Sequence, residues 1–252
     1  LNLFGGVVAN AARTIAYQVN SNVRSFVVDV AFAFNPQSMM SYKDDKARFY
    51  TLQFFSAKLS FVIYMIFALP IYLLTEPIIT LWLGECPTYT VPFIHGIIIY
   101  SLFRNVHGPV DIAFKSANKM KYYQICEIII MILNIPIIWL ALKLGFPLYS
   151  AFLIMAILEG VNLAAIMILS SRQISFPAQS FFTKVLLPGI IISTLSYLIC
   201  FISRYLISPE LSIIEILSYS LLFCIISFII NYMIMFTKQE RTKILTLFKI
   251  KK

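Results

Sequence analysis

Charged residues are scarce in this sequence, and their scarcity excludes an ordinary water-soluble fold. Asp, Glu, Lys and Arg make up 12% of the 252 residues and hydrophobic residues make up 60%, against about 25% and roughly 45–50% in soluble domains. Too few polar side chains remain to cover a globular surface. The apolar residues come in blocks, and about 20 apolar residues in a helix cross the hydrocarbon core of a bilayer. We therefore predict an all-α polytopic membrane protein.

The sequence also lacks the motifs of enzymes and metalloproteins. Its four cysteines have no paired or metal-ligand spacing, since three fall inside apolar blocks and Cys86 lies alone in a loop. We find no nucleophile with a neighbouring base, no glycine-rich phosphate loop and no cluster of metal ligands. We therefore expect no enzymatic activity, no catalytic residue, no cofactor, no disulfide and no metal site.

The apolar blocks predict about seven transmembrane helices in a single domain that covers residues 1–252. Short loops separate the blocks, and most contain proline or glycine, which stop helices. A further apolar stretch, residues 78–83, is too short to span and contains a Trp, so we expect a short helix at the membrane interface. The predicted spans are residues 7–34, 54–74, 91–114, 122–142, 149–169, 185–206 and 213–236.

Lys and Arg are unevenly distributed among the loops, which predicts the orientation of the chain. Fourteen of the twenty lie in the loops after the first, third, fifth and seventh predicted helices, two lie in the intervening loops, and four lie inside helices. Positively charged loops stay in the cytoplasm. We predict that the N-terminus lies outside and the C-terminus inside, and that the net charge of +9 reflects topology rather than binding to nucleic acid.

The first predicted span carries an unusual number of polar residues. An arginine or aspartate at the centre of a membrane helix costs about 2.5–3.5 kcal/mol on insertion scales, so this helix should line a bundle interior or a hydrated cavity. An α-helix turns by about 100° per residue, and this rotation places the polar side chains of the span in one stripe and in a cluster on the opposite side of the helix. The stripe holds Asn10, Arg13, Tyr17, Asn20 and Arg24, and the opposite cluster holds Gln18, Asn22 and Asp29. Two interpretations remain open: a cavity wall whose guanidinium groups bind an anion, and interhelical hydrogen bonds that hold the bundle together.

Titratable residues in later spans are candidates for ion or proton coupling. Arg104, His107 and Asp111 share one face of the third predicted span, where His107 and Asp111 are spaced to pair at i, i+4. Glu127 and Glu159 are acidic groups in otherwise apolar helices. Each candidate could instead be a neutral polar contact between helices. Lys58, near a helix end, is expected to snorkel to the interface.

The polar first span and its flank resemble a known family of transporters. The segment FGGVVANAARTIAYQVNSNVRSF at residues 4–26, followed by NPQSMMSY at residues 35–42, is similar to the second-lobe signature of polysaccharide-exporting flippases. LWLGECPTYTVPF at residues 81–93 and SANKMKYYQ at residues 116–124 also resemble that family. It belongs to the multidrug, oligosaccharidyl-lipid and polysaccharide exporter superfamily.

The resemblance implies two lobes of six helices, often with two extra C-terminal helices, around a cavity that opens alternately to either side. This chain resembles the second lobe plus those two helices, and the first lobe would be its missing partner. Because the chain begins at Leu1, without an initiator methionine, we expect it to be a fragment. The family implies a location in the bacterial inner membrane, among its lipids.

The substrates implied by the resemblance are undecaprenyl-diphosphate-linked oligosaccharides, the repeat units of O-antigen or capsule. Arg13 and Arg24 would then hold the diphosphate, while the neighbouring Asn, Gln and Tyr side chains would face sugars. An exporter of small drugs shares the fold but would have a more aromatic and less cationic cavity. A membrane-embedded glycosyltransferase or polymerase would carry a long external loop with catalytic residues, which this sequence lacks, and a seven-helix receptor would not have so polar a first span.

Overall fold

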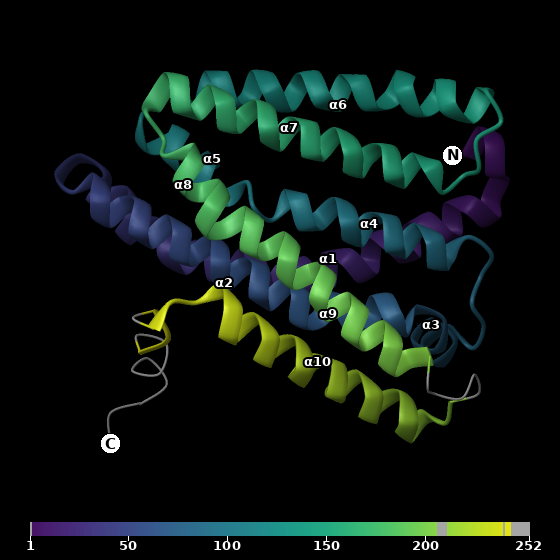
Figure 1. Ribbon diagram of the computed structural model, residues 1–252. Coiled ribbons are helices and arrows are strands. Elements are labelled where there is room, and N and C mark those ends of the chain that lie inside the picture. The colour runs from purple at the N-terminus through teal and green to yellow at the C-terminus, as the bar shows by residue number, and fades with distance from the viewer. Residues whose placement is uncertain (1, 206–210, 239, 243–252) are drawn as a thin grey trace.

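The structure is a computed structural model that describes residues 2–205, 211–238 and 240–242, and within these ranges it contains helices and no strand (Figure 1). The elements, in chain order, are α1 (Asn2–Asp44), α2 (Lys46–Leu73), α3 (Thr75–Leu83), α4 (Thr90–Arg104), α5 (Gly108–Ser116), α6 (Met120–Lys143), α7 (Ser150–Ile174), α8 (Ala178–Phe181), the π-helical turn η1 (Phe182–Leu186), α9 (Leu187–Tyr205) and α10 (Ile213–Met235). The predicted all-α class is confirmed.

Within the described residues, five helical segments are long and apolar enough to cross a membrane. They are α2, α6, α7, the run Ala178–Ile199 that joins α8, η1 and α9, and α10. These confirm the membrane character of the chain. The segments α1 and α4 fall outside this set, because α1 carries many polar residues and α4 has only 15 residues. The number of seven spans therefore stays a prediction, and residue 206, where the sixth was expected to end, lies outside the described residues.

Helix α2 lies at the centre of the bundle. It packs against α1, α4, α9 and α10, while α6 and α7 form a pair that meets the rest mainly through α4 and α5 (Figure 1). The core joins aromatic and aliphatic side chains of α2 with those of α4, α5 and α7. In contrast, few residues of α6 are buried inside the bundle, as expected where lipid tails replace protein neighbours.

The third predicted span is not one continuous helix. Helix α4 ends at Arg104, the chain turns through residues 105–107, and α5 begins at Gly108 with Pro109 in its first turn. Proline has no backbone N–H to donate and is favoured in the first turn of a helix, where that donor has no partner anyway. The prediction of an unbroken helix over residues 91–114 was wrong because this signal was overlooked.

The ends of α1 and α3 can also be compared with the helix boundaries predicted from the sequence. The first predicted span was expected to end at residue 34, but α1 continues through Pro36 to Asp44. The short helix expected over residues 78–83 is present as part of α3, while its location at the membrane interface stays a prediction. Helix α3 ends at Leu83 and is followed by Gly84, whose positive φ of 85° glycine adopts without strain.

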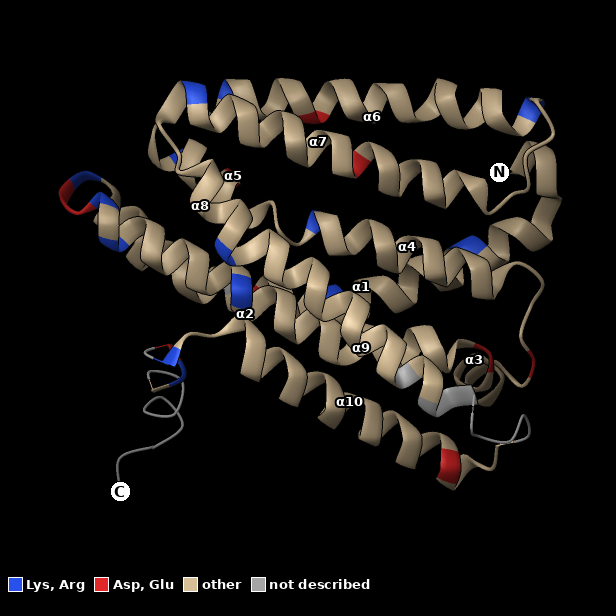
Figure 2. Cartoon of the chain, viewed as in Figure 1, with Lys and Arg blue, Asp and Glu red and all other residues tan. Residues whose placement is uncertain are grey.

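Charge is distributed unevenly between the two ends of the bundle. The α1–α2 connection, the start of α6, the η1 turn and the segment after α10 lie toward one end, where blue Lys and Arg gather (Figure 2). The opposite end carries acidic residues near α3 and at the start of α10. This distribution follows the alternation of basic loops in the sequence.

Candidate functional site

A polar cavity of about 170 Å³ lies between α1, α2, α5 and α6, beside the break between α4 and α5. This volume accommodates several water molecules. The side chains that make its wall polar come from five helices and the turn: Arg24, Asn35, Gln53, Ser56, Ser60, Arg104, Asn105, His107, Asp111 and Tyr123. The cavity brings together residues from the first and third predicted spans, both of which the sequence singled out.

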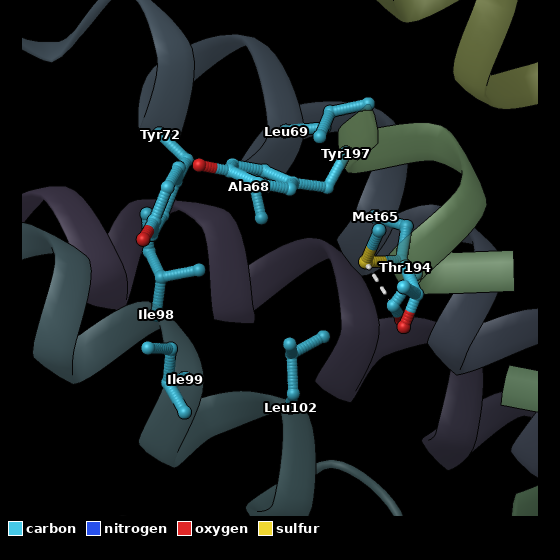
Figure 3. Close-up of a pocket in the computed structure, with 10 residues that line it drawn as sticks. Met65, Ala68, Leu69, Tyr72, Ile98, Ile99, Leu102, Thr194 and Tyr197 are labelled. Atoms are coloured by element: carbon cyan, nitrogen blue, oxygen red, sulfur yellow. Dashed lines mark hydrogen bonds between the residues drawn. The ribbon is translucent and has the colours of Figure 1, made fainter. Parts of the chain in front are cut away.

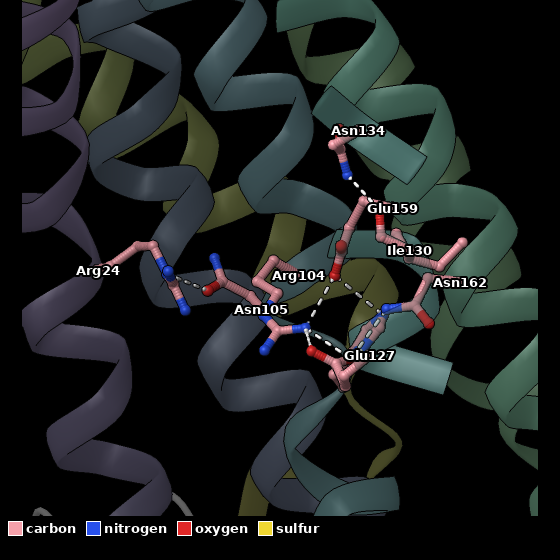
Figure 4. Close-up of polar contacts among 9 residues, drawn as sticks. Arg24, Arg104, Asn105, Glu127, Ile130, Asn134, Glu159 and Asn162 are labelled. Carbon is pink, nitrogen blue, oxygen red and sulfur yellow. Dashed lines mark hydrogen bonds and ion pairs between the residues drawn. The ribbon is translucent and has the colours of Figure 1, made fainter. Parts of the chain in front are cut away.

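An ion-pair cluster at one edge of the cavity joins α4, α6 and α7. The Nη1 atom of Arg104 lies 2.8 and 2.6 Å from the two carboxylate oxygens of Glu127, and 3.2 Å from Oε1 of Glu159 (Figure 4). Asn162 donates a hydrogen bond of 2.8 Å to Glu127. Two acidic side chains in apolar helices are thus tolerated because one guanidinium lies between them.

His107 completes this cluster from the turn after α4. Its Nδ1 lies 3.4 Å from Oε1 of Glu127 and its Nε2 lies 3.3 Å from Oε1 of Glu159, and the side chain is 3% exposed. A neutral imidazole can donate from one nitrogen only, whereas the protonated ring donates from both. Both nitrogens thus lie within ion-pair distance of a carboxylate, but neither makes a hydrogen bond in the described part of the chain.

The two carboxylates and the imidazole of this cluster also have the spacing of a cation site. One ligand atom from each of His107, Glu127 and Glu159 lies within 4.8 Å of the others. Arg104, however, already contacts both carboxylates. A metal ion would have to compete with this guanidinium for the same oxygens.

Asp111 does not pair with His107, and that part of the prediction was wrong. Its Oδ2 lies 2.6 Å from Nζ of Lys115, within α5. The break before α5 explains the difference, because it turns the imidazole of His107 toward α6 and α7. Asp111 still lines the polar cavity.

The residues of the predicted polar stripe on α1 do not line one common cavity. Arg24 donates from Nε to Oδ1 of Asn105 (3.3 Å) and lines the polar cavity. Asn20 is buried and accepts a hydrogen bond of 3.1 Å from the Tyr64 hydroxyl. Asn10 is half-buried, and its carbonyl accepts a hydrogen bond from Thr14. Of this stripe, only Arg24 therefore reaches the cavity beside the ion-pair cluster.

Arg13 and Tyr17 lie elsewhere. The guanidinium of Arg13 is 5.4 Å from the centre of the Tyr17 ring, and both residues line a separate cavity of about 290 Å³ with Asn134 and Trp139 of α6. The prediction that the two arginines act at one place is therefore not matched by their positions. Neither Arg13 nor Arg24 has a carboxylate partner among the described residues.

The opposite cluster on α1 remains exposed. Gln18, Asn22 and Asp29 all face outward from the bundle. Polar side chains are costly against lipid, so this face requires water or another polar surface beside it.

Sequence reasoning missed several residues of the cavity. Asn105 was hidden inside a span taken to be continuous, and Gln53 fell just before the predicted start of the second span. The signals were available: Gly108 and Pro109 mark the break, and Gln53, Ser56 and Ser60 recur at helical spacing on α2.

A further cavity of about 260 Å³ between α2, α4 and α9 is mainly apolar (Figure 3). Its wall includes Met65, Tyr72, Ile98 and Tyr197 and no charged side chain. The hydroxyl of Ser193, which also lines it, donates a long hydrogen bond of 3.7 Å to the sulfur of Met65. We therefore take the polar cavity with the ion-pair cluster as the candidate functional site. No family model, no curated protein and no solved structure matches the chain.

Proposed function

We propose that the chain is part of a flippase that moves undecaprenyl-diphosphate-linked oligosaccharides across the bacterial inner membrane by alternating access. The observation that supports this most is the exposure of polar side chains on two opposite sides of α1. Arg13 and Tyr17 are exposed on one side, and Gln18, Asn22 and Asp29 are exposed on the other, in a chain whose other long helices are apolar. Polar side chains exposed in this way suit a hydrated vestibule rather than lipid.

The chemistry of the polar side chains of α1 fits the proposed substrate. Guanidinium groups bind phosphate oxygens through paired hydrogen bonds, and amide and hydroxyl groups bind sugars. Arg13 and Arg24 are eleven residues apart, or roughly 16 Å along a helix. Two arginines at this separation cannot bind one diphosphate together, so each would hold the headgroup at a different depth during transport.

The ion-pair cluster would couple the movement to a proton gradient. An imidazolium at His107 would, together with Arg104, balance the formal charges of Glu127 and Glu159, whereas a neutral imidazole would leave a net charge of −1. Because His107 lies at the break between α4 and α5, this change would act where the backbone already bends. An orientation with the basic end of the bundle in the cytoplasm places the N-terminus outside. Alternating access further requires a second lobe beside α1.

The test uses the full-length protein in cells that depend on it for surface polysaccharide. We expect Arg24→Ala to reduce polysaccharide display by at least tenfold, while the amount of inserted protein stays unchanged. Arg48→Ala is the matched control, because Arg48 is an exposed arginine of α2 away from the cavity.

Normal display in the Arg24 variant would contradict the role of the cavity. Normal display together with greater sensitivity to small cationic drugs would favour the exporter of small molecules instead.

A further inference from the structure

Lys58 is buried in the middle of α2 and does not snorkel to the interface, as its sequence position had suggested. Its side chain is 6% exposed, and Nζ donates to both carboxylate oxygens of Glu240, at 3.0 and 2.9 Å. Glu240 lies 182 residues later, in the segment that follows α10. This ion pair fastens that segment to the central helix.

The segment after α10 has an ordered local structure of its own. Glu240 accepts hydrogen bonds from the backbone N–H (2.8 Å) and hydroxyl (3.0 Å) of Thr237. Burial alone would raise the pKa of Glu240, but the hydrogen bonds from Thr237 and Lys58 outweigh it and lower the pKa. Arg241 donates to the backbone carbonyls of Phe236 and Met233 at the end of α10. Glu240 is therefore ionised at neutral pH, and Arg241 is held in place.

A cavity of about 420 Å³ lies between this segment, α2, the η1 turn and the start of α9. It is lined by three cationic side chains, Lys58, Lys184 and Arg241, and by one acidic side chain, Glu240, so its formal charge is +2. Lys184 is exposed and lies within the π-helical turn. The rest of the lining includes Phe54, Pro188 and Ile234. A cationic site beside apolar surface requires an anion with an apolar part.

We propose that this cavity binds the phosphodiester headgroup of an anionic phospholipid, whose acyl chains lie along α9 and α10. The volume falls within the range of small-molecule sites, about 300–1,000 Å³. The cavity lies toward the end of the bundle where Lys and Arg gather, and basic pockets between membrane helices on that side recognise anionic headgroups (Figure 2). Exposed Ile190 and Ile234 extend the apolar wall toward lipid. The site does not depend on the proposed transport function.

The two sources of such a phosphate can be separated with purified full-length protein in nanodiscs. The probes are phosphatidylglycerol, titrated into phosphatidylcholine nanodiscs, and inorganic phosphate, added to phosphatidylcholine nanodiscs. The readout is the midpoint of thermal unfolding. We expect phosphatidylglycerol to raise the midpoint and inorganic phosphate to leave it unchanged. An equal rise with inorganic phosphate would overturn the lipid assignment.

Variants of opposite charge test the site itself. Lys184→Gln should require about fivefold more phosphatidylglycerol for the half-maximal effect, the factor expected for the loss of one hydrogen bond of about 1 kcal/mol to the headgroup. Glu240→Gln should require about fivefold less, because it removes the one acidic group of the cavity. Lys121→Gln, an exposed lysine at the start of α6 outside the cavity, is the matched control and should leave the titration unchanged.

Three outcomes would overturn the proposal. Equal effects of Lys184→Gln and Lys121→Gln would show that phosphatidylglycerol acts through general surface charge. An unchanged or weaker lipid response in Glu240→Gln would show that Glu240 only fastens the C-terminal segment. The absence of any effect of phosphatidylglycerol on the unsubstituted protein would exclude a site for it.

Discussion

Replacing Arg104 by methionine should destabilise the protein and also reveal the charge balance of the ion-pair cluster. The substitution keeps an apolar stem of similar length but removes the guanidinium that contacts Glu127 and Glu159. Removal of one partner from a buried ion pair costs about 3–5 kcal/mol. Arg104 and Glu127 are 27% and 23% exposed, whereas Glu159 is 5% exposed. Partial solvation of the first two favours the lower end of that range, about 3 kcal/mol.

A second substitution tests whether the loss arises from charge. In Arg104→Met the cluster carries a net charge of −1 with His107 protonated, and adding Glu159→Gln returns it to zero. We therefore expect the double variant to be more stable than Arg104→Met alone, although Glu159→Gln by itself should be destabilising. Such a reversal of sign is a coupling between neighbouring residues, which a double-mutant cycle measures.

The assay is unfolding of the purified full-length protein by sodium dodecyl sulfate in mixed micelles. Asn134→Ala is the control, because Asn134 bonds to the carbonyl of Ile130 in its own helix and not to the cluster. A loss below about 1 kcal/mol in Arg104→Met, the level of an exposed ion pair, would refute the reasoning. So would simple additivity of the two substitutions.

Two further predictions concern packing and pH. Gly96→Ala should cost about 1–3 kcal/mol by overpacking α4 against α7, because a Cβ there would lie 2.5 Å from that of Phe152; Gly160→Ala, whose Cβ would meet nothing closer than 3.8 Å, should be tolerated in the same unfolding assay. The lowered pKa of Glu240 means that its contact with Lys58 is fully stabilising above the ordinary value of 4.5 and is lost as pH falls through the lower pKa of the folded state. Amide exchange of the segment after α10 should therefore accelerate in that acidic range and should lose this pH dependence in Glu240→Gln; a dependence that persists in the variant would assign it to another group.

The parts of the fold that follow from hydropathy were predictable from the sequence. Helices α2, α6, α7 and α10 correspond to long apolar blocks, and lipid requires every backbone group in such a block to bond within its own helix. The break between α4 and α5 was missed because the spans were predicted from the length of apolar blocks, and a single Gly-Pro pair hardly changes that length. Local chemistry at Gly108 and Pro109, not hydropathy, ends that helix.

The candidate site was predictable residue by residue but not as an arrangement. Arg104, His107, Glu127 and Glu159 were all singled out because charge inside a membrane helix is costly. Which of them meet depends on how α4, α6 and α7 are rotated about their axes, and helical periodicity within one segment carries no information on that. Lys58 illustrates the same limit, since its partner, Glu240, follows 182 residues later, in the segment after α10.

The order of the cluster residues along the chain has a consequence for biosynthesis. Arg104 leaves the ribosome before Glu127 and Glu159, and domains assemble from their N-terminal side as synthesis proceeds. During that interval its guanidinium has no acidic partner from α6 or α7. The helices α4 to α7 would therefore have to leave the insertion machinery together, because releasing α4 alone would expose an unneutralised cation to acyl chains.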